Sequence, residues 1–528
     1  MRYYPAKTIS GIQRMDIRSV LCNAAILLLL GVNTASASSD EAACEALEQA
    51  LASATSISLN AKPFLAHTDE LPSHCRVRGE AVGKVGFELR LPLQADWNGK
   101  FMLAGCGGFC GQLLPDKPGY SNSINEALKQ GYAAMAHDSG HQSPSTADTN
   151  WARSGDDQAV ALWAAEVLPT LVAASDTIIS LYYDRAAQRR YFSGCSNGGR
   201  LGLVAAQRYP GLFDGIAAGG PILDLSGNAG VQGAWMIQQA WTPEGEPRFT
   251  PAHIDRLATH VRNACDHLDG VQDGLIATPE RCQPDLAALR CTTNTDAGCL
   301  NDDQLQRVAA LYRGAHDGEQ QLFPGLPAGS EHLWPFWITG REGQPAWGQQ
   351  ASQGFLDIYR GVPAGEHINP ATIDVVAEAQ AMSNSPLALS ANAIDPDLSG
   401  LREAGTKLLL WHGWADPLIL PQRTISYYES AITENGGARA LAEGARLFLV
   451  PGHGHCWEAP GQAPDLFDPL HALDKWVEEN TPPAQIVARD TLAPEATEAT
   501  ALLCPYPQRA IYNAHGPMDE ASSYHCGK

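Results

Sequence analysis

The chain has 528 residues, of which 44% are hydrophobic and 18% are charged, so it lacks the composition of a disordered protein. A single hydrophobic core rarely grows past about 250 to 300 residues, so we expect a large domain and a second module. Acidic residues outnumber basic ones by 58 to 36, which gives a formal net charge of -22. This charge argues against nucleic acid and anionic membrane surfaces as partners.

Residues 1–37 are predicted to be a secretory signal peptide. Basic residues precede an apolar run over 24–32, and residues 35–37 (Ala-Ser-Ala) form a small-residue cleavage site. The alternative is a short membrane anchor, but the run is well below the roughly 20 apolar residues of a membrane span. No later stretch is long and apolar enough to be expected to span a bilayer. The sequence therefore predicts a secreted or periplasmic protein with no membrane contact after cleavage, and it leaves the oligomeric state open.

The first predicted elements are a helix over 41–54 and a strand region over 75–93, where apolar residues mostly alternate with polar or small ones. A short buried strand over 101–104 then runs directly into a glycine-rich loop over 105–111. That loop is either a flexible connector or a source of backbone N–H groups for an oxyanion, because glycines let the main chain approach a substrate closely. A bridge within the loop would stiffen it, which a mere connector would not need.

Helices and strands then alternate along the chain. Such alternation predicts an α/β fold, with a mostly parallel sheet that is covered on both faces. The alternation lapses from about 221 to 399, where cysteines, glycines and prolines are frequent, and we predict an inserted module there. The expected helices are 124–130, 159–180, 201–208, 425–434 and 469–479, and the expected strands are 132–136, 191–195, 407–412 and 446–450.

The candidate nucleophile is Ser196, which lies in the sequence Gly-Cys-Ser-Asn-Gly at 194–198 between a predicted strand and a predicted helix. Glycines on both sides of the serine permit a sharp strand-to-helix turn that exposes the hydroxyl above the sheet. A five-residue pattern of this kind also arises by chance in a glycine-rich chain. The serine therefore needs partners elsewhere in the sequence.

Asp416 and His455 are the candidate partners, since each follows the carboxyl end of a predicted strand. Serine, acid and histidine in this order along the chain are typical of α/β-hydrolases. A serine hydroxyl needs an imidazole to take its proton and a carboxylate to orient that imidazole. Asp416 alone is equally compatible with a turn before Pro417, and His453 competes with His455 for the role of base.

Thirteen cysteines are present, and all but Cys22 lie beyond the predicted signal peptide, so disulfides are expected in an exported chain. Cys195 precedes Ser196 and Cys456 follows His455, so a bridge between them would fasten the nucleophile to the base; two unrelated buried thiols are the alternative. This pair favours His455 over His453. Proximity in sequence suggests Cys44–Cys75, Cys265–Cys282, Cys291–Cys299 and Cys504–Cys526, with Cys106–Cys110 as a further pair.

These motifs, Gly-Cys-Ser-x-Gly-Gly and Gly-His-Cys with cysteines beside the serine and the histidine, resemble those of the tannase and feruloyl esterase family. The resemblance extends over most of the mature chain, including the loop at 105–111, the segment at 138–141 and the sequence Cys-Pro-Tyr-Pro at 504–507. It implies an α/β-hydrolase fold with an inserted lid domain. Residues 38–221 and 400–528 would form the catalytic domain, and residues 222–399 would form the lid.

The resemblance also implies a serine carboxylic-ester hydrolase that works through an acyl-enzyme. Ser196 would attack, His455 would carry the proton and Asp416 would orient the histidine. The five suggested bridges other than Cys106–Cys110 match the usual bridges of the family, whereas that pair is an addition, because the family loop is commonly glycine there. The amide of Asn197 and one from Cys106, Gly107 or Gly108 would bind the oxyanion.

A second candidate site lies at 265–275, where three aspartates surround glycines in a turn. Carboxylates suit a hard cation with several oxygen ligands, and solvated turn aspartates are the alternative reading. The family resemblance implies a structural Ca²⁺ in the lid. Its ligands would be the side chains of Asp266, Asp269 and Asp273 and the carbonyls of Val271 and Leu275.

The expected substrate is a small aromatic ester of feruloyl or galloyl type. The nearest alternative is hydrolysis of mono(2-hydroxyethyl) terephthalate, and a catalytically idle binding protein on a hydrolase scaffold is the alternative from another class. Arg200 and Arg360 are either contacts for a substrate carboxylate or phenolate or solvated surface arginines, and His137, His141 and His412 are assigned structural roles. The aromatic patch is either lid core or a stacking wall for the acyl group; it comprises Trp334, Phe336, Trp337 and Trp347.

Overall fold

The computed structural model describes residues 39–528 apart from 54–55, 69, 154, 293–297, 342–343, 457–463, 465 and 490–498. The predicted signal peptide therefore lies outside the described residues. Residues 39–51 form a helix that precedes the first strand.

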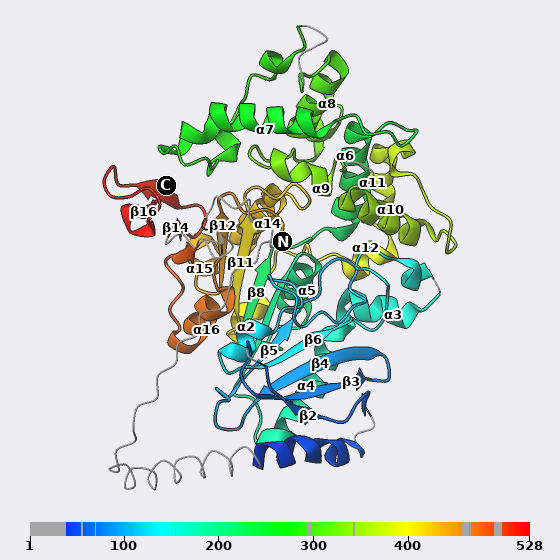
Figure 1. Ribbon diagram of the computed structural model, residues 1–528, viewed down its shortest axis with the longest axis vertical. Helices are drawn as coiled ribbons and strands as arrows, with labels where there is room; N and C mark the ends of the chain where they lie inside the picture. The colour runs from blue at the N-terminus through cyan, green and yellow to red at the C-terminus, as the bar shows by residue number, and fades with distance from the viewer. Residues whose placement is uncertain are drawn as a thin grey trace, which may run out of the picture.

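Within these described residues, the centre of the molecule is a ten-stranded sheet with the order β1-β3-β4-β6-β5-β7-β8-β11-β12 and β2 paired with β3 (Figure 1). Neighbouring strands from β6 to β12 in this order run parallel, while β1 to β4 add an antiparallel edge. The predicted α/β fold is confirmed. The strands are β1 Ile57–Leu59, β2 Phe64–Ala66, β3 His74–Ala81, β4 Val85–Pro92, β5 Lys100–Ala104, β6 Ala133–His137, β7 Arg189–Cys195, β8 Gly215–Gly219, β11 Lys407–Gly413 and β12 Ala445–Val450.

Helices cover both faces of the sheet, as expected for strands that are buried on both sides. One face packs against α4, α5 and α14 and the other against α2 and α16, and each face has its own cluster of buried apolar side chains. Each of β7, β11 and β12 is followed along the chain by one of these helices, and because the three strands are parallel their carboxyl ends lie at the same edge of the sheet. The helices are α2 Asn125–Lys129, α3 Asp157–Ala161, α4 Val167–Tyr183, α5 Asn197–Arg208, α14 Pro421–Glu434, α15 Ala438–Leu441 and α16 Pro469–Glu479.

The long helix over Asp157–Tyr183 contains one π-helical turn, η2 Leu162–Glu166, between α3 and α4. Among the described residues, it is the one helix that is long and apolar enough to cross a membrane. No stretch of this kind beyond the signal peptide was predicted from the sequence. Its most apolar window is 56% buried inside the protein. Its apolar side chains pack in the core beside the sheet, which identifies it as a core helix.

The segment between β8 and β11 carries most of the remaining helices, and those from α6 to α11 gather beyond one end of the sheet in Figure 1. They are α6 Gly233–Ala240, α7 Pro251–Cys265, α8 Asp302–Arg313, α9 Trp334–Trp337, α10 Trp347–Arg360, α11 Val375–Ser383, α12 Pro386–Ala391 and α13 Ser399–Ala404, with the hairpin β9 Ala315–Asp317 and β10 Gln320–Phe323. Short 3-10 turns and the π-helical η3 Ser226–Gln232 link them. This segment is where the alternation of strands and helices lapses in the sequence.

The chain ends in two small antiparallel pairs beside β12. These are β13 Ile486–Arg489 with β14 Thr500–Leu503, and β15 Arg509–Tyr512 with β16 Tyr524–Gly527. The disulfide Cys504–Cys526 links β16 to the residue that follows β14.

Candidate active site

Ser196 occupies the turn between β7 and α5, with a backbone φ of +64°. This left-handed conformation is unfavourable for a residue with a side chain, and it persists where the surrounding structure enforces it. A Cβ atom on Gly198 would lie 2.9 Å from the carbonyl carbon of Gly105. The glycine therefore allows α5 to contact the loop after β5 backbone to backbone.

A hydrogen-bonded chain connects the three residues expected from the sequence. The Nε2 atom of His455 lies 2.9 Å from Oγ of Ser196, and its Nδ1 atom lies 2.7 Å from Oδ2 of Asp416. A protonated Nδ1 donates to the carboxylate in this geometry, which leaves Nε2 free to accept from the serine hydroxyl. All three side chains are largely buried, with Ser196 8%, His455 4% and Asp416 1% exposed.

Asp416 is held by four donors, one of which is His412. Its Oδ1 atom accepts hydrogen bonds from the backbone N–H groups of Leu418 and Ile419, both at 2.9 Å, and its Oδ2 atom accepts from His455. Burial alone would raise the pKa of this carboxyl, but His455 and His412 outweigh burial and hold the pKa well below its usual range. The carboxylate therefore stays ionised beside the imidazole.

His412 is a contact of the acid that the sequence reading treated as merely structural. Its Nε2 atom lies 3.3 Å from Oδ2 of Asp416 and 2.8 Å from the carbonyl oxygen of Ile419, while Nδ1 lies 2.8 Å from the hydroxyl of Thr424. The two acceptors near Nε2 require the ring hydrogen there. His453, the competing histidine, is fully buried beside Trp411.

All six expected disulfides are present, which confirms the predicted pairing. Cys195–Cys456 joins the turn that carries the serine to the loop that carries the histidine, with Cα atoms 5.8 Å apart. Cys106–Cys110 lies within the glycine-rich loop. The other four are Cys44–Cys75, Cys265–Cys282, Cys291–Cys299 and Cys504–Cys526.

The glycine-rich loop turns back on itself beside Ser196. The backbone N–H of Cys110 donates to the carbonyl of Gly107 at 3.0 Å, and the side-chain amide of Asn197 donates to the carbonyl of Cys106 at 3.2 Å. Among the residues that the structure describes, the backbone N–H groups of Gly107, Gly108 and Asn197 donate to no other group. These three residues also line the cavities that open onto Ser196, whereas Cys106 does not.

Two cavities meet at Ser196 and Trp347. One contains His455 and is lined partly by apolar and aromatic side chains and partly by polar side chains from loop regions; the polar ones include Lys117, Ser121, Asn122 and Thr146. The other lies under η3 and α10 and has mostly apolar walls; its lining includes Ile222, Leu225, Ala229, Met236, Leu418 and Ile419.

The aromatic side chains singled out in the sequence, expected either in the core of the insertion or as a wall of the site, fall into two groups. Trp334 is fully buried and belongs to the core of the inserted segment. Phe336, Trp337 and Trp347 line the cavity that contains His455, and the ring of Trp337 meets the imidazole edge-on with centroids 5.2 Å apart. The inserted segment therefore supplies part of the wall around the triad.

Neither arginine considered as an anion contact lines these cavities. Arg200 is fully buried in α5, with its donors occupied by protein carbonyl oxygens. Arg360 is paired with Glu378 on the inserted segment.

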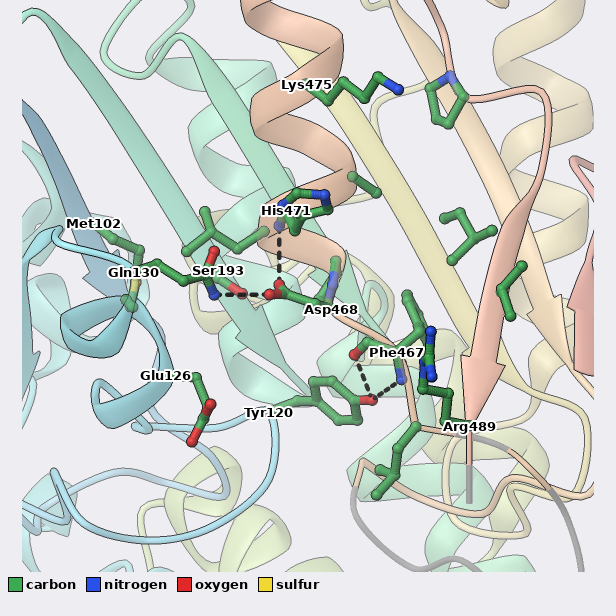
Figure 2. Close-up of a pocket in the computed structure, with 18 of the residues that line it drawn as sticks. Met102, Tyr120, Glu126, Gln130, Ser193, Phe467, Asp468, His471, Lys475 and Arg489 are labelled. Atoms are coloured by element: carbon green, nitrogen blue, oxygen red, sulfur yellow. Dashed lines mark hydrogen bonds between the residues drawn. The ribbon is translucent and has the colours of Figure 1, made fainter. Parts of the chain in front are cut away.

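A larger cavity of about 810 Å³ lies elsewhere, against α16 and β13 (Figure 2). Tyr120 and Phe467 hydrogen-bond to each other in its wall, and Lys475 and Arg489 stand around it. No residue of the hydrogen-bonded triad lines it. Its size alone does not make it the reactive site, since the nucleophile, base and unpaired N–H donors all lie at the smaller cavities.

The aspartate turn at 265–275 has the donor chemistry of a calcium loop. One oxygen of each of Asp266, Asp269 and Asp273 accepts backbone N–H groups of the turn, which leaves the second oxygen of each for another partner. Burial, together with the neighbouring carboxylates, raises the pKa of Asp269 to about 6 and also raises that of Asp273. Among the described residues, however, no group of three acidic, histidine or cysteine side chains is already gathered as a metal site.

A family model described as tannase and feruloyl esterase matches residues 70–527. The chain belongs to the tannase and feruloyl esterase family. Similar members include an uncharacterized esterase of Xanthomonas campestris pv. campestris, 32% identical over 95% of this chain and 93% of its own length. The mono(2-hydroxyethyl) terephthalate hydrolase of Piscinibacter sakaiensis is 30% identical over 88% of this chain and 87% of its own. A probable feruloyl esterase of Arthroderma benhamiae is 29% identical over 84% and 83%.

Solved structures of the tannase and feruloyl esterase family have the same fold. Feruloyl esterase B from Aspergillus oryzae superposes with a TM-score of 0.78 at 23% identity, over 92% of this chain and all (100%) of that one. Tannin acyl hydrolase from Aspergillus niger gives 0.73 at 20% identity, over 92% and 94%. The predicted α/β-hydrolase fold is confirmed, and as a member of this family the protein is a carboxylic ester hydrolase.

Proposed function

We propose that this protein is an exported serine esterase that hydrolyses esters of aromatic acids through an acyl-enzyme. The observation that carries the proposal is the hydrogen-bonded chain from Ser196 through His455 to Asp416, beside backbone N–H groups that have no partner in the described structure. A binding protein on an idle scaffold would not need such a chain. The six disulfides support an oxidising compartment, and hence export to the periplasm or the medium.

In the first half-reaction, Oγ of Ser196 attacks the ester carbonyl while Nε2 of His455 takes the hydroxyl proton. The carbonyl oxygen becomes an oxyanion, which accepts hydrogen bonds from the N–H of Asn197 and from that of Gly107 or Gly108. The ionised carboxylate of Asp416 stabilises the imidazolium. His455 then returns the proton to the leaving alcohol oxygen, and the C–O bond breaks to leave the acyl-enzyme.

In the second half-reaction, His455 takes a proton from a water molecule, which attacks the acyl carbon. Collapse of this second tetrahedral intermediate releases the carboxylic acid and returns the proton to Ser196. Because His455 must reach the leaving oxygen, the cavity that contains His455 suits the alcohol and the apolar cavity suits the acyl group.

The lining of the apolar cavity favours an uncharged aromatic acyl group. None of the described side chains around it is charged. Asn228 donates one hydrogen bond to the carbonyl of Leu418, and Ser352 donates to that of Gly230. The amide and hydroxyl oxygens remain as acceptors for the phenolic O–H of a feruloyl or galloyl group, whereas no cationic side chain among the described residues lines the cavity to pair with the free carboxylate of a terephthalate monoester. That monoester is the second candidate substrate, because the similar protein from Piscinibacter sakaiensis is a mono(2-hydroxyethyl) terephthalate hydrolase.

The test is turnover of methyl ferulate, methyl gallate and mono(2-hydroxyethyl) terephthalate by the wild type and by Ser196→Ala. We expect turnover of at least one phenolic ester by the wild type and a loss of several orders of magnitude in the variant. Retained turnover in the variant would exclude the serine mechanism. Wild-type silence on all three esters would favour the binding function.

We also propose that Asp266, Asp269 and Asp273 and the carbonyls of Val271 and Leu275 hold a structural Ca²⁺. The support is the donor set, because closely spaced carboxylates that raise one another's pKa repel each other less when a cation is bound between them. Bound there, Ca²⁺ would neutralise the turn and rigidify it. It would take no part in ester hydrolysis.

A further inference from the structure

Arg200 lies in the first turn of α5 and is 0% exposed. Its Nε atom donates to Oδ1 of Asn197 at 2.8 Å. Its Nη1 atom donates to the carbonyls of Ala164 and Ala391 at 2.7 and 2.8 Å, and Nη2 donates to that of Trp163 at 2.9 Å. Every partner is a neutral carbonyl oxygen, so the guanidinium is held without a counter-charge among the described residues.

Such an arrangement is costly, because a buried charge is normally paired with an opposite one. Burial lowers the pKa of Arg200 to about 9, and the nearby charge of Arg208 adds to this effect. The lowered pKa reflects the cost of burying the charge. Costly buried groups concentrate at functional sites. The contacts of Arg200 lead from its guanidinium to the residues proposed to bind the oxyanion.

The first contact fixes the side chain of Asn197. A guanidinium only donates hydrogen bonds, so the amide oxygen must face Arg200 and the amide NH₂ must face the opposite direction. There it donates to the carbonyl of Cys106 at 3.2 Å and lies 3.2 Å from Sγ of Cys110. Arg200 thus decides which end of the amide reaches the glycine-rich loop.

The second contact fixes one peptide unit of that loop. The carbonyl of Cys106 and the N–H of Gly107 belong to the same planar trans peptide, so they point in opposite directions. Holding the Cys106 carbonyl with the Asn197 side-chain amide therefore turns the N–H of Gly107 away from that side-chain amide, which leaves it free for the oxyanion. Donation to the carbonyl also polarises the peptide and strengthens its N–H as a donor.

The remaining contacts anchor Arg200 to two further segments. Pro169 has no N–H to donate to the preceding turn of helix, and Nη1 of Arg200 donates to the carbonyl of Ala164 in that π-helical turn. Ala391 is the last residue of α12 in the inserted segment. The guanidinium plane is thus fixed from three sides, which suits a group that must orient another.

We propose that Arg200 is a positioning residue for the oxyanion hole, acting through the Asn197 side chain on the peptide between Cys106 and Gly107. This inference rests on the serine mechanism proposed above. It gives the extra bridge Cys106–Cys110 a role, since the bridge closes the loop that the Asn197 amide holds.

The experiment measures hydrolysis of p-nitrophenyl butyrate, which does not depend on the aromatic substrate class. Arg200→Met and Asn197→Ala are each expected to lower kcat by about 10- to 100-fold with KM nearly unchanged, because a misaimed donor weakens the transition state more than the ground state. Arg200→Lys keeps the charge but not the forked guanidinium, so its kcat should lie between those of the wild type and Arg200→Met. The double variant should lose no more than the worse single variant, because both act on one chain of contacts.

A second readout separates positioning from loss of structure. A boronic acid that forms a tetrahedral adduct with Ser196 should bind the variants more weakly by the same factor as kcat falls, while the product acid binds them unchanged. The matched control is Arg208→Met. Arg208 lies on the same helix and donates to the carbonyls of Ser390 and Asn392 beside Ala391, yet it does not touch Asn197. Arg208→Met should lower the melting temperature and leave kcat unchanged.

Full kcat in Asn197→Ala, or multiplying losses in the double variant, would overturn the proposal. If Arg200→Met does not fold, Asn197→Ala and Arg200→Lys still decide it. Turnover by Ser196→Ala would instead remove the serine mechanism on which the proposal rests. An inactive Ser196→Ala with a fully active Asn197→Ala would overturn the role of Arg200 alone.

Discussion

Glu331 is a buried carboxyl of the inserted segment that lies near the triad loops. It is 1% exposed, and it accepts hydrogen bonds from the hydroxyl of Tyr312 at 2.6 Å and from the backbone N–H of Gly329. Burial raises its pKa to about 7, although these donors oppose the shift. It also lines a cavity of about 160 Å³ together with Ala415 and Gly452, which are residues of the acid and base loops.

Glu331 should make the stability of the protein depend on pH. The folded state binds the proton more tightly than the unfolded chain, so its contribution is complete below pH 4.5 and is lost as the pH rises to about 7. The loss is at most about 3 kcal/mol. Glu331→Gln keeps the acceptor and the shape but does not titrate. The melting temperature of the variant relative to that of the wild type should therefore increase as the pH is raised from 5 to 8. Parallel curves across this range would contradict the prediction.

At the residue scale, the sequence predicted side chains whose role is tied to a motif or to their order along the chain. Ser196 follows from the glycines around it, and Cys195 and Cys456 favour His455 over its neighbour His453. Arg200 was considered either as a contact for a substrate anion or as a solvated surface arginine, and only the packing around it shows that it is buried. The contact of His412 with the acid was missed for the same reason.

At the scale of elements, the strands that carry the triad were predictable because each is a short buried run followed by a turn and a helix. The predicted strand region at 75–93 is instead a hairpin, β3 and β4, whose pattern alone does not mark the turn at Val82 and Gly83. The helix over Asp157–Tyr183 continues past Pro169, because the π-helical turn and Arg200 accommodate the missing N–H. Contacts of this kind are distant in sequence and leave no local pattern.

The bridge Cys195–Cys456 should act on both stability and catalysis. It closes a sequence separation of 261 residues, for which loop-closure entropy gives about 5 kcal/mol, against about 3 kcal/mol for the 22 residues of Cys504–Cys526. Replacing both cysteines of the first bridge by alanine should lower the melting temperature and also reduce kcat about 10- to 100-fold, since the serine and the base lie on its two sides. The same replacement at Cys504 and Cys526 should lower the melting temperature alone. Equal kcat in both variants, measured well below melting, would contradict the prediction.

At the scale of the whole molecule, the inserted segment supplies part of the lining of the candidate active site. Trp337 and Trp347 reach the cavity around His455, and Met236 lines the apolar one. The aspartate turn also lies near the loops of the acid and the base. Gly274 and Leu275 of the turn line the same cavity as Ala415 and Gly452 of those loops. The aspartate turn and the loops that carry the acid and the base therefore border one cavity.

The proposed Ca²⁺ should stabilise this junction. Calcium at 100 times its dissociation constant adds about 2.7 kcal/mol to the folded state, so the melting temperature should fall in EDTA and recover in excess CaCl₂. Asp269→Asn and Asp273→Asn should melt at the same temperature with and without calcium, because each removes a charged ligand. Asp285→Asn is the matched control, since Asp285 caps a neighbouring turn of the same segment and should leave the response to calcium intact. A wild type that melts identically in EDTA and in CaCl₂ would show that the turn is held by its backbone hydrogen bonds alone.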